Sequence, residues 1–245
     1  MGTFRTSARH CVELLARSER ARKRVISVGS IEYILQRRQV FKDFAIDLTL
    51  DVGANTGQFA HDLRAFYKGD LISFEPVSSA FRHLASTASR DPRWKVYQLA
   101  LGSQTATQPI YVGVRTDMSS FLKTSAYATK RHGQNAAISG QELVSVRRLD
   151  DVLDEVAPDC HRQRIFLKMD TQGYDLEVFQ GLGNKLQHVV AIQSEVSLIP
   201  IYEGMPHWTD SILVYERAGF AVAGLFPVTL DGCRVIEYDC LMVRV

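Results

Sequence analysis

Two features of the sequence are best suited to chemistry. The first is a glycine-containing turn that begins with an acidic residue, and the second is another acidic residue farther along the chain. An apolar run ends at Asp51, and the chain then turns through Gly53 and Gly57. Glycines in such a turn let the backbone approach a ligand closely. A second apolar run ends in Glu75, 18 residues after Gly57. In open α/β sheets an acidic residue at that strand end accepts hydrogen bonds from both hydroxyls of a ribose, so the pair predicts a nucleotide pocket.

The spacing of this turn favours S-adenosylmethionine (SAM) over a dinucleotide. A dinucleotide fingerprint reads G-x-G-x-x-G and receives a pyrophosphate at a helix end, whereas this chain has Asp51-x-Gly53-x-x-x-Gly57. SAM has a ribose for Glu75, no phosphate, and an ammonium that Asp51 would attract. The same turn also occurs in ordinary strand-to-helix connections, but Glu75 followed by Pro76 at the next strand end favours the pocket.

Length and composition indicate one α/β domain. The chain has 245 residues, of which 46% are apolar and 23% are charged, and this suffices for one well-buried core. Its four cysteines form no C-x-x-C pair and have no histidine at metal-ligand spacing, so we expect reduced thiols and no metal. No stretch approaches the roughly 20 apolar residues that span a bilayer, and the N-terminus lacks the apolar core of a secretory signal. We therefore expect a cytoplasmic protein.

Residues 1–42 form a basic segment, which we expect to be a helical extension of a domain that spans residues 43–245. The segment holds ten Lys or Arg against three Glu, which gives a net charge of +7. Its apolar residues suffice to pack partly against the body of the domain. The charge fits an anionic membrane surface, a nucleic acid or an acidic partner, and it also fits a solvated helical face.

Apolar runs alternate with helical patterns at the spacing of βαβ units, which predicts a mostly parallel sheet with helices on both faces. Seven strands are expected, at residues 46–52, 70–75, 95–101, 164–170, 188–196, 220–226 and 234–244. Helices are expected between them, near residues 57–67, 78–88, 149–156, 174–182 and 208–218. Asp231-Gly232 is a hairpin signal between the last two strands, so the sheet should end in an antiparallel pair.

One interval breaks this alternation. Residues 109–114 and 143–147 are candidate short strands, and residues 115–142 between them are polar with few periodic apolar positions. A connection of that length inside a compact domain is usually a binding loop, a lid or a disordered insertion. We favour a lid over the substrate site, and a flexible linker is the alternative.

Several motifs in order make the chain resemble the FkbM family of methyltransferases over roughly residues 45–225. They are Asp51-Val-Gly-Ala-Asn-Thr-Gly57, Phe74-Glu75-Pro76, Ala100-Leu101-Gly102, Met118-Ser-Ser120, Arg148-Leu-Asp150, Leu167-Lys-Met-Asp-Thr-Gln-Gly-Tyr-Asp175 and Glu195. The resemblance implies a Rossmann-like class I methyltransferase fold, in which a mostly parallel seven-stranded sheet ends in an antiparallel hairpin. It also implies SAM as methyl donor and an acceptor hydroxyl on a sugar, polyketide or similar metabolite.

The resemblance also implies a donor site. The residues assigned to it are Asp51, Gly53, Ala54, Asn55, Glu75, Pro76, Ala100 and Leu101. The first four would line the methionine end of SAM, and Glu75 would hold the ribose hydroxyls. Ala100 and Leu101, at the end of the third strand, would lie near the adenine.

Two carboxylates are candidates for the general base that takes the hydroxyl proton during methyl transfer. Asp170 ends the fourth predicted strand, at the edge of the sheet where ligands bind in open α/β folds. We therefore expect Asp170 to be the base. Glu195, near the end of the fifth strand, is the second candidate and could also bind acceptor hydroxyls. Either carboxylate could instead cap a helix by satisfying free amides.

Other side chains are candidate contacts for the acceptor, namely Ser119, Ser120, His132, Tyr202 and His207. His132 falls in the expected lid and His207 follows the fifth strand, so either could also act as a base. The histidines show no H-E-x-x-H or H-x-H pattern, and a catalytic metal is not indicated. Lys168 is expected to point toward a helix layer.

Together these expectations describe a SAM-dependent O-methyltransferase acting on a hydroxyl of a sugar, a glycolipid or a secondary metabolite. A glycolipid is favoured because the basic N-terminal segment could hold the enzyme at the inner face of an anionic membrane. One alternative is an RNA ribose methyltransferase, with nucleic acid the less expected partner. The other is a noncatalytic SAM-binding protein, against which Glu75 and Asp170 argue.

Overall fold

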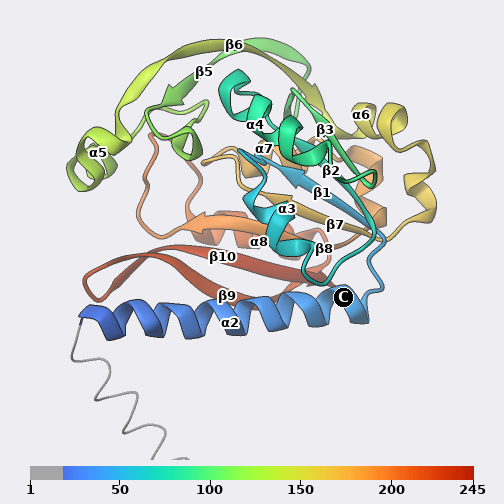
Figure 1. Ribbon diagram of the computed structural model, residues 1–245, viewed down its shortest axis with the longest axis horizontal. Coiled ribbons are helices and arrows are strands. Elements are labelled where there is room, and N and C mark those ends of the chain that lie inside the picture. The colour runs from blue at the N-terminus through green and yellow to red at the C-terminus, as the bar shows by residue number, and fades with distance from the viewer. Residues whose placement is uncertain (1–18) are drawn as a thin grey trace, which may run out of the picture.

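The computed structural model describes residues 19–245, with side chains from residue 31 onward, as an α/β fold with two sheets (Figure 1). The larger sheet has the strand order β3-β2-β1-β7-β8-β10-β9, and the smaller has the order β4-β6-β5. The strands of the larger sheet are β1 (Leu48–Val52), β2 (Asp70–Phe74), β3 (Trp94–Tyr97), β7 (Ile165–Met169), β8 (Val189–Ser197), β9 (Phe220–Asp231) and β10 (Arg234–Arg244). Those of the smaller sheet are β4 (Ala100–Gly102), β5 (Ala106–Gly113) and β6 (Ile138–Arg148).

Helices cover both faces of the larger sheet. The α-helices are α2 (Glu19–Asp43), α3 (Gln58–Leu63), α4 (Ser78–Ala88), α5 (Ala126–His132), α6 (Leu149–Val156), α7 (Asp175–Gln180) and α8 (Trp208–Arg217). On one face, Phe41 of α2 and Leu63 of α3 share an apolar core with Phe166 of β7. On the other face, Val178 of α7 and Tyr215 of α8 belong to a second core.

The centre of the sheet is parallel, and its last two strands form an antiparallel pair. β1 pairs in parallel with β2 and β7, and every residue of β1 and β7 is buried. Strands covered on both faces read as continuous apolar runs, which is why these two were visible in the sequence. β10 pairs antiparallel with β8 and with β9, and Gly232 in the turn has a φ of 60°. The predicted fold class, a Rossmann-like class I methyltransferase sheet with a terminal hairpin, is confirmed.

The predicted strand at residues 95–101 is wrong, because two strands occupy this interval. β3 ends at Tyr97 as the edge strand of the larger sheet, and β4 begins at Ala100 and pairs with β6 in the smaller sheet. Both pieces are apolar, so periodicity alone does not show that the chain changes sheets between them. The break directs the chain from the edge of one sheet toward the other.

The polar interval at residues 115–142 is folded. It contains two short 3-10 helices, η1 (Thr116–Met118) and η2 (Gly133–Ala136), with α5 between them. β6 begins at Ile138, five residues before the predicted strand, and pairs antiparallel with β5. Figure 1 shows the long β5–β6 ribbon passing over the strand ends of the larger sheet. The interval is therefore anchored at both ends by a sheet of its own.

The basic N-terminal segment is helical from Glu19 onward, and its residues 1–18 lie outside the described part of the chain. α2 runs alongside β9 (Figure 1), and the side chain of Gln36 donates a hydrogen bond to the carbonyl of Ala223. Within residues 19–245, no helix combines the length and the apolar character needed to cross a bilayer.

Replacing Phe41 should show that α2 is part of the folded core. Its ring is 6% exposed and lies 4.7 Å, between centroids, from the ring of Phe166. We expect Phe41→Ala to lower the free energy of unfolding by about 3 kcal/mol, because it removes a buried aromatic ring. The control is Leu35→Ala on the same helix, where the side chain is 59% exposed. The free energies of unfolding would be measured by urea denaturation. Equal values for the two variants would contradict the packing of α2 against the core.

Candidate functional site

Two cavities adjoin at the carboxyl ends of β1, β2 and β7. The Glu75 cavity, of about 70 Å³, is lined by residues between Val52 and Tyr174, including Glu75, Ala100 and Leu101. The Glu195 cavity, of about 510 Å³, lies between α2, α3 and the β8–β10 strands. Gly53, Asn55, Asp117 and Asp170 line both cavities, so these residues mark the place where the two meet.

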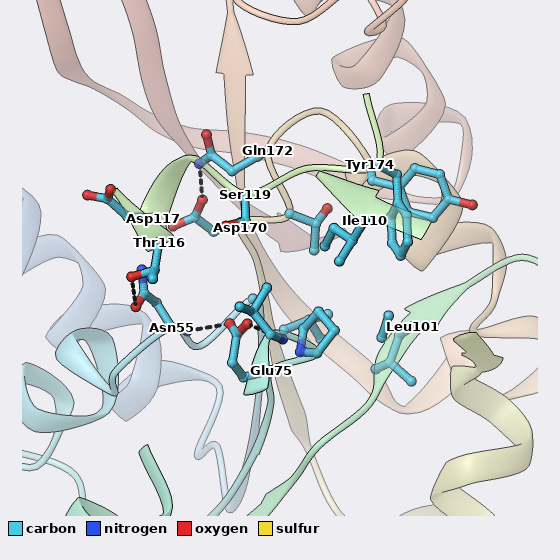
Figure 2. Close-up of a pocket in the computed structure, with 17 residues that line it drawn as sticks. Asn55, Glu75, Leu101, Ile110, Thr116, Asp117, Ser119, Asp170, Gln172 and Tyr174 are labelled. Carbon is cyan, nitrogen blue, oxygen red and sulfur yellow. Dashed lines mark hydrogen bonds between the residues drawn. The ribbon is translucent and has the colours of Figure 1, made fainter. Parts of the chain in front are cut away.

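Glu75 presents a buried carboxylate to the smaller cavity (Figure 2). Its two oxygens accept hydrogen bonds of 2.8 Å from the backbone amides of Asn55 and Val77. A carboxylate offers about four lone-pair sites, so each oxygen can accept one further hydrogen bond from a ligand. Burial raises the pKa of Glu75 to about 7, although the two amides act in the opposite direction. The site therefore favours a ligand with hydroxyl donors that stabilise the ionised carboxylate.

The glycine turn lies against the end of β7. Gly53 has a φ of 78°, and a Cβ atom there would lie 2.0 Å from the backbone oxygen of Asp170. Only glycine fits so close an approach. Asn55 also has a positive φ, of 46°, and its side-chain oxygen accepts a hydrogen bond of 3.1 Å from Thr116 of η1. The turn therefore joins the Glu75 cavity to the β5–β6 insertion.

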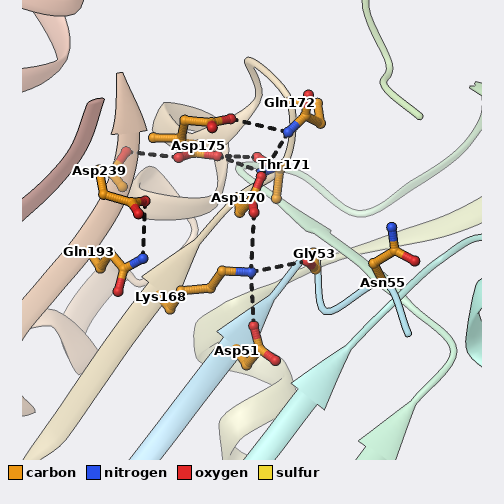
Figure 3. Close-up of polar contacts among 12 residues, drawn as sticks. Asp51, Gly53, Asn55, Lys168, Asp170, Thr171, Gln172, Asp175, Gln193 and Asp239 are labelled. Carbon is orange, nitrogen blue, oxygen red and sulfur yellow. Dashed lines mark hydrogen bonds and ion pairs between the residues drawn. The ribbon is translucent and has the colours of Figure 1, made fainter. Parts of the chain in front are cut away.

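A buried ion pair lies beneath the turn (Figure 3). The ammonium of Lys168 lies 3.0 Å from a carboxylate oxygen of Asp51 and 3.5 Å from one of Asp170, and it donates to the carbonyl of Gly53 at 3.1 Å. Burial lowers the pKa of Lys168, but the two carboxylates raise it further, so its net pKa is above the usual value. The lysine remains charged and ties β1, β7 and the glycine turn together.

Gln172 organises the groups around Asp170. Its amide nitrogen donates to Asp170 at 2.8 Å and to Glu195 at 3.1 Å, and its oxygen accepts from the hydroxyl of Tyr202 at 2.7 Å. The residue has a φ of 55°, which is uncommon for a residue with a side chain. Because Gln172 spans Asp170 and Glu195, it holds the two carboxylates in fixed positions.

The carboxylates of the larger cavity have different proton affinities. Burial, together with the charges of Asp170 and Glu237, raises the pKa of Glu195 well above its usual range. Burial and Asp170 raise the pKa of Asp239 to about 6. Asp239 is the cross-strand partner of Glu195, and like charges at such positions disfavour ionisation of both. Glu195 is therefore suited to hold a proton at neutral pH, whereas Asp170 has Lys168 beside it.

Most of the residues assigned to the donor site line the Glu75 cavity, namely Gly53, Asn55, Glu75, Pro76, Ala100 and Leu101. Ala54 lines the Glu195 cavity. Asp51 is among the lining residues of neither cavity, because β1 continues through Val52 and the Asp51 side chain is fully buried with Lys168 and Ser73. The Asp51 carboxylate is already paired with the Lys168 ammonium, so its expected contact with a ligand ammonium stays a prediction that the cavity linings do not support. Lys168 does lie over the Phe59 ring of the α3 layer, but its ammonium turns back to the strand ends.

The candidate acceptor residues are dispersed. Ser119 lines the Glu75 cavity, beside the donor-site residues. Ser120 and Tyr202 are 1% exposed and support Gln172, since the Ser120 hydroxyl donates to its backbone oxygen at 2.7 Å. His132 and His207 line neither of these cavities, and His207 is exposed at the start of α8.

The capping alternative for Asp170 does not apply, because α7 begins without a side-chain cap and Asp170 bonds to side chains. The residue that satisfies a free amide there is Asp175, whose carboxylate accepts from the backbone of Thr171 at 2.8 Å. Within residues 19–245, no three His, Cys, Asp or Glu side chains are grouped as a metal site would require.

Several residues that line the two cavities were not predicted from the sequence. Gln172 belongs to the Lys-Met-Asp-Thr-Gln block, but no role was assigned to it from the sequence. Its position two residues after Asp170, a carboxylate at a strand end, is the signal that could have indicated one. Arg37 of α2, Gln193 of β8 and Asp239 of β10 line the Glu195 cavity. They are brought together only by tertiary structure, and no spacing in the sequence connects them.

Comparison with known proteins places this site in a described family. The profile of the methyltransferase FkbM domain matches residues 51–222. Among solved structures, an rRNA methylase from Streptococcus thermophilus is 10% identical over 85% of this chain and 94% of its own, with a TM-score of 0.44. Magnesium protoporphyrin IX methyltransferase from Synechocystis PCC 6803, solved with bound SAM, is 9% identical over 89% and 81%, with a TM-score of 0.48. A search of curated proteins found no match.

Replacing Glu75 should abolish the pH dependence of nucleoside binding. With a pKa of about 7 in the free protein, the ionised fraction of Glu75 rises about tenfold between pH 6 and pH 8. Calorimetry with S-adenosylhomocysteine should therefore give an affinity that rises about tenfold over this range. Glu75→Gln should bind at least about tenfold more weakly at pH 8, and its affinity should not change with pH.

The matched control is Glu155→Gln, which alters an exposed carboxylate on α6. This variant should reproduce the wild-type affinities at both pH values. Equal binding by wild type and Glu75→Gln at pH 8 would remove Glu75 from the ribose site.

Proposed function

The chain belongs to the FkbM family of methyltransferases, and on that basis we propose that it transfers a methyl group from SAM to a hydroxyl of a sugar or glycolipid. One observation carries the proposal. The cavity that contains the Glu75 carboxylate meets a larger polar cavity at Asp170, an acidic residue held between a cation and an amide. A donor and an acceptor placed in the two cavities would meet beside a proton acceptor.

The residues that line the Glu75 cavity match the chemical groups of SAM, and the cavity, at about 70 Å³, would have to widen to hold the whole molecule. Glu75 has one free lone pair on each oxygen for the ribose hydroxyls, and Ala100, Leu101 and Ile110 provide an apolar surface for the adenine. Gly53 supplies backbone that can approach the ligand closely, because no side chain stands there. When bound, SAM supplies a methyl group whose bond to sulfur breaks, with the electron pair remaining on sulfur, as a bond to the acceptor oxygen forms.

Asp170 is the base in this proposal. It lines both cavities and so faces the place where an acceptor hydroxyl would lie. As the oxygen attacks, its proton passes to the Asp170 carboxylate. Glu195, whose pKa is raised by burial and by Asp170, keeps its own proton and can donate it in a hydrogen bond to another acceptor oxygen. The remaining requirement is the alignment of oxygen and methyl carbon, which the two cavity walls would provide.

The larger cavity has the mixed lining of a carbohydrate site. Phe59 and Phe226 provide aromatic surface, while Glu195, Asp239 and Gln193 provide hydrogen-bonding groups. Its volume of about 510 Å³ lies within the roughly 300–1,000 Å³ typical of small-molecule sites.

The mouth of the Glu195 cavity favours an acceptor with an apolar part. Ile34 of α2 and Val228 of β9 line the cavity and are also 43% and 47% exposed. Ile31 and Leu35 on α2 add further exposed apolar surface. A lipid chain attached to the sugar could lie on this surface, with the basic N-terminal segment against an anionic membrane face.

Transfer of label should identify the acceptor class. Incubation of the protein and methyl-labelled SAM with a cell extract that includes membranes should place the label in the lipid fraction. The labelled bond should survive mild alkali, because an ether resists hydrolysis that cleaves a methyl ester. A reaction without the protein serves as the background control. Label in the RNA fraction would favour a ribose methyltransferase instead, and no label above this background in any fraction would favour a noncatalytic protein.

Substitution of the two carboxylates should separate their roles in that assay. Asp170→Asn should lower turnover by about 100-fold, the usual contribution of a general base, while S-adenosylhomocysteine affinity changes by less than about threefold. Glu195→Gln keeps a hydrogen-bond donor and should mainly raise KM. Wild-type turnover in Asp170→Asn would exclude Asp170 as the base. If Glu195→Gln lost more turnover than Asp170→Asn, Glu195 would be assigned as the base and Asp170 as the hydrogen-bonding group.

A further inference from the structure

One wall of the Glu195 cavity comes from α2, which precedes the part of the chain that matches the methyltransferase family. Tyr33, Ile34 and Arg37 line the cavity from this helix. The helix is fixed in place by the packing of Phe41 against Phe166 and by the hydrogen bond from Gln36 to Ala223. This wall is firmly held and lies outside residues 51–222, which match the family model, so it can contribute to the choice of ligand.

Arg37 is a buried cation whose hydrogen-bonding capacity is only partly used. It is 4% exposed, donates to the Tyr33 hydroxyl at 3.2 Å, and lies over the Tyr33 and Phe59 rings at 4.8 and 5.0 Å. Among residues with described side chains, none accepts a hydrogen bond from its Nε, and no carboxylate forms an ion pair with it. A buried donor left without an acceptor is costly, so an Arg in this state is suited to meet a ligand oxygen.

Gln193 provides the complementary group from β8. It is also 4% exposed, and its amide nitrogen donates to Asp239 at 3.1 Å (Figure 3). Its side-chain oxygen is buried and accepts no hydrogen bond from the described residues. Arg37 on the α2 wall and Gln193 on the β8 wall therefore each carry one buried polar atom, a donor and an acceptor, that has no partner among the described residues. Hydroxyl groups can satisfy both, because each hydroxyl donates one hydrogen bond and accepts others.

The charge of the cavity decides between a neutral and an acidic ligand. Five carboxylates line it, namely Asp62, Asp117, Asp170, Glu195 and Asp239. Arg37 and Lys168 are the basic residues among the described lining side chains. An anionic group would meet a surplus of negative charge here, whereas neutral hydroxyls can bond to both charged and protonated carboxyl groups.

We infer that Arg37 and Gln193 form a specificity subsite that binds hydroxyls of an uncharged sugar ring of the acceptor, while Asp170 faces the hydroxyl that is methylated. This inference rests on the proposed function and extends it to the part of the acceptor that does not react. Aromatic rings beside Arg37 would contact the apolar face of the sugar, and the two orphaned polar atoms would fix its orientation.

Binding of simple glycosides tests the subsite without the natural acceptor. Saturation-transfer NMR on the full chain with S-adenosylhomocysteine would use a panel of methyl glycosides of neutral hexoses, with methyl glucuronide as the acidic probe. Wild type should give signals with at least one neutral glycoside and weaker signals with the glucuronide. Arg37→Met and Gln193→Leu should each reduce the neutral signal at least fivefold. Arg38→Met, which alters an exposed arginine on the same helix, should leave it unchanged.

Binding of S-adenosylhomocysteine shows whether each variant keeps its donor site. S-adenosylhomocysteine affinity should stay within twofold of wild type in all three variants, and loss of this binding in wild type would count against the proposed function and not against the subsite. If Arg37→Met fails to fold, Gln193→Leu decides. Three results would each overturn the subsite. They are wild-type glycoside signals in Arg37→Met, or in Gln193→Leu where Arg37→Met does not fold, tighter binding of the glucuronide than of the neutral glycosides, and no signal from wild type with any neutral glycoside.

Discussion

The site depends on one buried cation. Lys168 is 5% exposed and lies between the carboxylates of Asp51 and Asp170, with the carbonyl of Gly53 as a third partner. These partners belong to β1, to the end of β7 and to the glycine turn, so a single ammonium fixes the relative positions of three segments. Removing one member of such a group leaves an uncompensated buried charge, which costs several kcal/mol. The ion pair also places a carboxylate at the junction of the two cavities and keeps a cation beside it.

The same cation gives the carboxylates different surroundings. Asp170 lies next to Lys168, whereas Glu195 and Asp239 face each other across β8 and β10 without so close a cation among the described residues. Burial and the charge of Asp170 raise the pKa of Asp239 to about 6, and burial with the charges of Asp170, Glu237 and Asp239 raises the pKa of Glu195 well above its usual range. Environments that push the proton affinities of neighbouring groups apart separate a base from a hydrogen-bond donor. In the proposed reaction, Asp170 would be the proton acceptor and Glu195 would be the carboxyl group that keeps its proton.

Strand ends were predictable because apolar runs stop where the ligand-facing residues begin. Glu75 and Asp170 were placed at the edge of the sheet by this rule, and the structure has them there. Asp51 lies in β1 as predicted, but its side chain is fully buried beside Lys168 and lines neither cavity, which the strand prediction alone does not show. The change of sheet between β3 and β4 and the convergence of Arg37, Gln193 and Asp239 depend on contacts between distant segments. No local pattern encodes such contacts, and the sequence alone could not predict them.

The two cavities differ in how many of their lining residues lie within the part of the chain that matches the family model. All 17 residues that line the Glu75 cavity fall within residues 51–222. Of the 18 that line the Glu195 cavity, seven fall outside this range, three on α2 and four on β9 and β10. Donor chemistry constrains its residues closely, because every member of a methyltransferase family must hold the same nucleoside. Walls contributed by a flanking helix and a terminal hairpin can change without disturbing that site, so we expect acceptor choice to reside in α2 and β9–β10.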